Sequence, residues 1–130
     1  MNTISVEVSE ENGLSFELLV DGKPMGAVLG DGNEGIPYWL AKDGLPTFPP
    51  SGATADHSVR IVSVCGCGEY GCGHSRCNIT QTNEIVEFSN FSGDVGAKGK
   101  DFQFRFPVAQ YQVVCEKMSI QANERISSET

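Results

Sequence analysis

Cysteine, histidine and glycine gather in one segment of the chain, residues 60–80, with the sequence RIVSVCGCGEYGCGHSRCNIT. The side chains there that could bind a metal are Cys65, Cys67, Cys72, His74 and Cys77. Thiolates together with one imidazole are ligands that tetrahedral zinc prefers in proteins. The glycines allow positive φ angles, through which several side chains can converge on one point. The segment therefore predicts a zinc site.

The spacing of these residues is C-x-C-x4-C-x-H-x2-C, which differs from the paired C-x2-C knuckles of common zinc sites. A structural zinc site takes four ligands. We expect Cys65, Cys67 and Cys72 to supply three of them, with either Cys77 or His74 as the fourth. The alternative is that the glycines shape a tight turn and the cysteines pack as small buried hydrophobic side chains, as free cysteine commonly does.

Two further interpretations of the same segment have less support. Gly66–Gly71 matches the G-x-G-x-x-G string of dinucleotide-binding proteins, but that motif works only where a helix begins at the glycines. The residues that follow are too polar and too rich in glycine for such a helix. A thiol-dependent enzyme would use Cys67 or Cys72, activated by His74 or His57, yet the sequence supplies no third orienting group.

Length and cysteine usage set the broad class of the protein. The chain has 130 residues, enough for one domain over 1–130 whose core needs no disulfides. The cysteine count of five is odd, and the first residues lack the pattern of a signal peptide, so we expect reduced thiols and a cytoplasmic location. No stretch is long and apolar enough to suggest a membrane span.

The formal net charge of −8 restricts the class of partner. Nucleic acid and anionic membranes are disfavoured, because binding to either requires clustered lysine and arginine. The charge suits a basic protein partner. The alternative is that it serves only to keep the protein soluble.

The N-terminal part of the chain combines strand patterns with acidic residues. Alternating hydrophobic residues predict strands at 4–8 and 14–20, followed by a third at 25–29 in an antiparallel meander. Between residues 7 and 34 there are seven acidic residues and one basic residue. We expect Glu7 and Glu17 to share the solvent face, within an acidic patch that binds the partner. The residues we nominate for this patch, with two aromatic anchors, are Glu7, Glu17, Asp21, Glu34, Tyr38 and Trp39.

The rest of the chain predicts four more strands and one helix. Turn-forming residues predict loops at 43–57 and 92–101. Hydrophobic patterns typical of strands occur at 59–64, 76–82, 85–91 and 102–106. From Pro107 onward, apolar residues recur every three or four positions, as in an amphipathic helix, and the polar tail from about 123 should fray. We therefore predict an α+β fold, an antiparallel sheet of about six strands with a C-terminal helix packed on one face.

The order of four motifs resembles a group of small bacterial proteins of unknown function. The motifs are the C-x-C-G-x-x-G-C loop at 65–72, the F-S-x-F strand at 88–91, F-x-F at 104–106 and A-Q-Y at 109–111. The resemblance covers roughly residues 14–118 and implies no activity. Those relatives generally lack counterparts of His74 and Cys77, so a metal site would be particular to this chain or absent.

A second resemblance is to the immunity proteins of bacterial contact-dependent growth inhibition systems. Many of these are small, acidic, cytosolic and rich in β-structure, and they neutralise basic nuclease toxins. The resemblance implies that an acidic surface docks onto the cationic active site of a toxin and replaces its phosphates. We therefore expect a non-enzymatic binding protein of this kind. The alternatives are a structural zinc-binding protein and a thiol-dependent enzyme.

Overall fold

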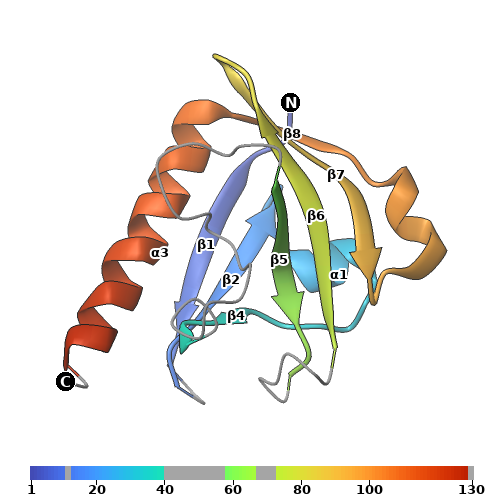
Figure 1. Ribbon diagram of the computed structural model, residues 1–130. Helices are drawn as coiled ribbons and strands as arrows, with labels where there is room; N and C mark the ends of the chain where they lie inside the picture. Colours follow the sequence, from blue (N-terminus) through green and yellow to red (C-terminus); the bar gives the residue numbers. More distant parts are fainter. Residues whose placement is uncertain (11–12, 40–57, 67–72, 129–130) are drawn as a thin grey trace.

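The fold is that of a computed structural model, which describes residues 1–10, 13–39, 58–66 and 73–128 (Figure 1). In this part of the chain, the strands form two four-stranded antiparallel sheets, and a long C-terminal helix packs against them. The predicted α+β class is confirmed. The strands differ from the expectation in forming two sheets instead of one. The predicted loop at 43–57 lies outside the described residues.

The first sheet is built on an antiparallel hairpin. Its strands are β1 (Ile4–Ser9), β2 (Ser15–Val20), β3 (Lys23–Pro24) and β4 (Ile36–Pro37), with β1, β3 and β4 all paired to β2. Ile4 and Val6 are buried while Ser5 and Glu7 are exposed, as alternation along a strand with one covered face requires. The hairpin places Glu7 directly opposite Glu17.

The prediction of a strand at residues 25–29 is wrong. These residues form the short helix α1 (Met25–Leu29), which starts after Pro24 and ends at Gly30, whose φ is +69°. Met25 and Leu29 are four residues apart, so one helical turn directs both into the core. A run of five apolar or small residues fits a strand and a helix turn equally well, and here the left-handed glycine ends the helix.

The second sheet follows the order of its strands along the chain. The strands are β5 (Ser58–Val64), β6 (His74–Gln81), β7 (Ile85–Gly93) and β8 (Phe104–Pro107). These agree with the predicted segments, except that β6 begins at His74 and the last strand begins at Phe104. The predicted loop at 92–101 contains the 3-10 helix η2 (Gly96–Asp101).

A short connector, residues 31–37, joins the two sheets. Glu34 exchanges two backbone hydrogen bonds with Val64 at the end of β5, at N···O distances of 2.8 and 3.3 Å. Two residues later, Ile36 pairs with Phe16 in β2. On the other side of the molecule, the Asn2 amide donates to the Arg105 carbonyl at 2.8 Å. The two sheets therefore meet along both sides and enclose a shared core.

The carboxylate of Asp31 fixes the start of this connector. The Ser63 and Ser75 hydroxyls donate to its Oδ2 atom at 2.9 and 2.5 Å, and both serines are fully buried. The backbone amide of Asn33 donates to the Asp31 Oδ1 atom at 2.8 Å. Since an unpaired buried hydroxyl is costly, Asp31 stabilises the β5–β6 pair as well as its own turn.

The helix α3 (Val108–Ser128) lies alongside β1 (Figure 1) and also contacts β7 and β8. Tyr111, Val114 and Met118 are its buried stripe, as the spacing predicted. The Tyr111 ring meets Phe88 edge-on at a centroid distance of 6.2 Å. The helix continues to Ser128, past the point where we expected fraying. No helix among the described residues combines the length and the apolar character that crossing a membrane requires.

Replacing Asp31 with alanine tests whether the connector stabilises both sheets. The D31A variant leaves two buried hydroxyls without an acceptor, so we expect it to lower the free energy of unfolding by about 3 kcal/mol. Urea denaturation measures this loss. The control is the triple variant D31A/S63A/S75A, which removes the stranded hydroxyls and should recover at least half of the stability. A triple variant no more stable than D31A would contradict the role of Asp31.

Candidate functional site

Three carboxylates line up across the first sheet and the connector, and we call Glu7, Glu17 and Glu34 the acidic row. Glu7 and Glu17 are directly opposite each other in β1 and β2, so their side chains lie on the same face. Glu34 lies on the other side of β2, where the backbone of Gly35 packs against it so closely that a Cβ atom would be 2.6 Å from the Phe16 carbonyl. The connector therefore brings a third acid next to Glu17.

Glu17 is the most perturbed member of the row. Its side chain is partly buried, and its Oε2 atom is buried without a hydrogen-bond partner among the described residues. Burial, followed by the negative charges of Glu34, Glu7 and Asp31, raises the pKa of Glu17 from 4.5 to about 7. At neutral pH Glu17 is therefore about half protonated, because burial and the neighbouring acids disfavour its ionised form.

Glu34, at one end of the row, lies next to Gly66 in the cysteine-rich segment at residues 60–80. A Cβ atom on Gly66 would lie 3.0 Å from the Glu34 Oε1 atom, a tighter contact than side chains usually make. The glycine therefore leaves the space that the Glu34 carboxylate fills. The two features that the sequence singled out, the acidic patch and the cysteine segment, are neighbours at this point.

Asp21 does not belong to the acidic row. It lies in the turn after β2 with a φ of +52°, and it accepts hydrogen bonds at 2.8 Å from the Asn2 side chain and from the Thr3 amide. These bonds hold the pKa of Asp21 below its usual range. Asp21 lies four positions after Glu17 along the chain, about 13 Å away in extended backbone. Asp21 therefore fixes the start of β1, and its place in one patch with Glu17 stays a prediction.

Tyr38 and Trp39 also lie away from the row. Their rings meet edge-on at 5.5 Å, and the Arg125 guanidinium of α3 is 5.9 Å from the centre of the Tyr38 ring. Helix α3 covers the face of β1 that carries Val6, whereas Glu7 points from the opposite face. The two aromatic residues therefore do not share a surface with the three acids.

Cys77 lies within the hydrophobic core. It is fully buried in β6, and burial raises the pKa of its thiol. The Cys65 amide donates to the Gly73 carbonyl at 2.9 Å, and Cys77 lies four positions beyond Gly73, about 13 Å away in extended backbone. This placement argues against Cys77 as the fourth zinc ligand and agrees with the alternative that it packs as a small hydrophobic residue.

His74 is the first residue of β6. It pairs with Val64, the residue before Cys65, so the two candidate ligands lie at the same end of the β5–β6 pair. The His74 Nε2 atom is 3.1 Å from the Arg76 guanidinium. Cys67 and Cys72 lie outside the described residues, and within those residues no three His, Cys, Asp or Glu side chains form a group that could hold a metal. The zinc site and the thiol nucleophile remain predictions.

The dinucleotide interpretation conflicts with the local fold. The motif needs a helix after its glycines, but His74–Gln81 form strand β6 instead. Sequence reasoning also did not nominate Asp31 for the site, although Asp31 adds a third negative charge near Glu17, after Glu34 and Glu7. The available signal was the pair Ser63 and Ser75, because hydroxyls at interior strand positions need an acceptor.

Comparison with known proteins gives no relative for this chain. No family model matches it, and neither the curated proteins nor the solved structures contain a match. The resemblances drawn from the motifs therefore remain predictions, and function is inferred from the site itself.

Glu17→Gln should remove a pH dependence from the stability of the fold. The folded-state pKa of Glu17 is raised, so its contribution to stability is fully present below pH 4.5 and is lost as the pH rises through about 7. With a discount for partial exposure, E17Q should stabilise the protein by about 1 to 2 kcal/mol at pH 8. At pH 4 it should have little effect. Thermal unfolding at both pH values measures this, and equal shifts at the two pH values would contradict it.

Cys77→Ser separates a core role from a ligand role. A hydroxyl in the core lacks the apolar fit of the thiol, so C77S should lower the free energy of unfolding by about 1 to 3 kcal/mol. The zinc-to-protein ratio of purified C77S, measured by elemental analysis, should equal that of the wild type. A lower zinc ratio in the variant would restore Cys77 as a ligand.

Proposed function

We propose that this chain is a non-enzymatic binding protein whose acidic row accepts a cationic group of a basic protein partner. The observation that carries the proposal is the state of Glu17, a half-buried carboxylate crowded by other acids, with one oxygen that lacks a hydrogen-bond partner among the described residues. An arrangement of this kind costs stability in the free protein. A guanidinium or ammonium group placed beside Glu17 would relieve the repulsion and supply the missing donor.

The shape of the row suits a side chain of the partner. Glu7 and Glu34 are exposed on either side of Glu17, so the site is accessible from solvent. Arginine matches such a site best, because its planar guanidinium donates to two carboxylates at once and is always charged. Lysine would bind as a point charge.

The kind of partner follows from the net charge and the row together. A net charge of −8 attracts a basic protein over a distance, and complementary charges raise the rate of encounter. Nuclease active sites carry arginine and lysine that bind phosphates, and a row of carboxylates can occupy such a site. The proposal is therefore an immunity protein that blocks the active site of a basic nuclease toxin.

Binding to a basic toxin domain encoded beside this chain tests the proposal. Calorimetric titration with the wild type should show a complex that weakens as salt increases. E17Q/E34Q should weaken binding by about 10- to 100-fold, because a desolvated charge pair is lost. E17Q is expected to stabilise the fold, so weaker binding could not be attributed to unfolding.

Asp21→Asn is the matched control, since it removes one negative charge outside the row. D21N should leave the affinity within about twofold of the wild type, as expected for a charge at the rim of an interface. Equal losses in D21N and the single variant E17Q, which each remove one negative charge, would reduce the effect to net charge and contradict a site at the row. Failure of the chain to protect cells from the neighbouring toxin would contradict the immunity role.

A further inference from the structure

A groove runs between β1 and α3 on the side of the first sheet away from β2. Its walls are Ile4 and Val6 of β1 and Val113, Val114 and Lys117 of α3, and its volume is about 370 Å³. Val113 is 65% exposed, although it stands beside the buried Val114. The groove is therefore a mainly apolar surface that α3 leaves uncovered, of a size that binding pockets commonly have.

The outer edge of β1 faces this groove. The Asp21 amide donates to the Thr3 carbonyl, so the odd-numbered residues of β1 pair with β2, and the even-numbered residues direct their backbone groups outward. The amide of Ile4 donates to the Gln110 side chain at 3.2 Å. Within the described ranges, no hydrogen bond reaches the outward backbone groups of Val6 and Val8. An edge of this kind is a template for another strand.

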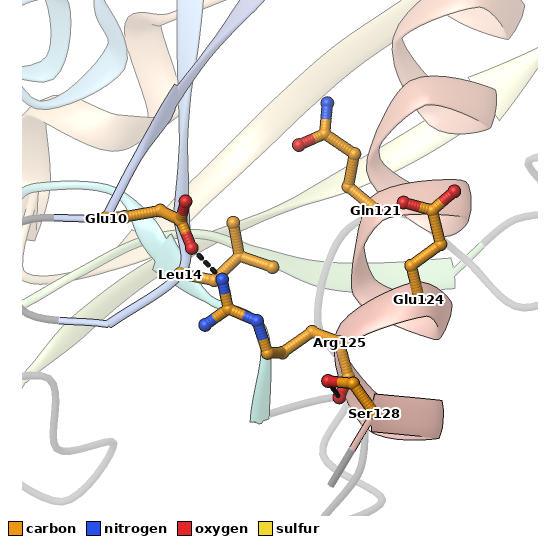
Figure 2. A pocket seen from close by; sticks show the side chains of 6 residues that line it. All are labelled: Glu10, Leu14, Gln121, Glu124, Arg125 and Ser128. Carbon is orange, nitrogen blue, oxygen red and sulfur yellow. Dashed lines mark hydrogen bonds and ion pairs between the residues drawn. The ribbon is translucent and has the colours of Figure 1, made fainter.

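Two contacts between α3 and the β1 side limit the length of the open edge. The Gln110 bond to Ile4 closes one end, and an ion pair between Arg125 and Glu10 closes the other. Figure 2 shows Arg125 reaching from α3 toward Glu10, with Gln121 and Glu124 on the same side of the helix. The edge between these contacts, residues 5–9, spans about 17 Å, which accommodates a strand of about five residues.

The two sides of the edge require different side chains of an added strand. On the groove side, Val6 and Val113 favour apolar residues. On the opposite side, a residue across from Glu7 would extend the acidic row by one position, where a lysine or arginine is favoured as a cross-strand partner. The occupant that fits is an extended segment in which apolar and basic residues alternate.

We propose that the basic partner adds such a strand, antiparallel, to the edge of β1 in the groove against α3. This inference rests on the proposed function, because it assigns the partner's basic residues to the acidic row. A second copy of the chain is a poorer occupant. Each copy carries a net charge of −8, and edge-to-edge pairing would bring the Glu7 side chains of both copies to the same face of one sheet.

The probe is the synthetic peptide acetyl-Lys-Val-Arg-Val-Lys-Val-amide, titrated into the full chain. In the antiparallel arrangement the peptide's valine amides face β1 and its basic residues point their amides away. Binding should slow hydrogen exchange of the Val8 and Val6 amides by at least about tenfold, as measured by NMR. Absence of binding, or binding without this protection, overturns the proposal.

Two methylated peptides provide a control that needs no protein variant. N-methylation of the first two peptide valines removes donors that face β1 and should weaken binding by about tenfold or more. N-methylation of the first lysine and the arginine leaves those donors intact and should change the affinity by less than about threefold. Equal losses with the two peptides overturn an edge-strand complex.

Variants of exposed α3 residues test the groove wall. Val113→Asn places an amide in the groove and should weaken peptide binding by about tenfold, while Ile120→Asn alters an exposed residue that does not line the groove and should have no effect. Because both side chains are exposed, both variants should fold. If a basic toxin binds in an E17Q-sensitive manner but ignores V113N, the edge inference is overturned and the proposed function stands. If toxin binding is insensitive to E17Q/E34Q, the proposed function fails.

Discussion

The connector at residues 31–37 is the constraint on which the rest of the structure depends. A sheet needs a second layer to bury its apolar face. The connector holds the two sheets together through backbone pairing of Glu34 with Val64 and of Ile36 with Phe16. Asp31, at the start of the connector, fixes its position by accepting hydrogen bonds from two buried serines of β5 and β6. With the sheets fixed in this way, α3 closes the remaining side of the core with Tyr111 and its neighbours.

The same connector generates the site. The backbone pairing that joins the sheets also places the Glu34 carboxylate beside Glu17, whose pKa rises because burial and neighbouring acids disfavour its ionised form. A fold optimised for stability alone would not crowd these groups, so the crowding is a reason to infer function. The open edge of β1 carries Glu7, and it therefore connects the row with the groove beside α3.

Local patterns in the sequence predict most of the fold. Alternation identifies β1, β2 and the strands of the second sheet, and the hairpin between residues 9 and 15 is enough to place Glu7 beside Glu17. The pattern of residues 25–29 predicts a strand instead of α1, because a single helical turn has too few residues to show its period. The positions of Asp21 and Tyr38 relative to the row could not be predicted, because they depend on long-range contacts, with Asn2 and with α3, that no local pattern contains.

The central claim is that the connector forces Glu34 against Glu17, and an NMR titration of side-chain carboxyl carbons tests it most directly. In the wild type, the Glu17 carboxyl should titrate with a midpoint near pH 7, while in Glu34→Gln the midpoint should shift toward 4.5. A Glu17 midpoint near 4.5 in the wild type, or one unchanged by the loss of Glu34, would contradict the account.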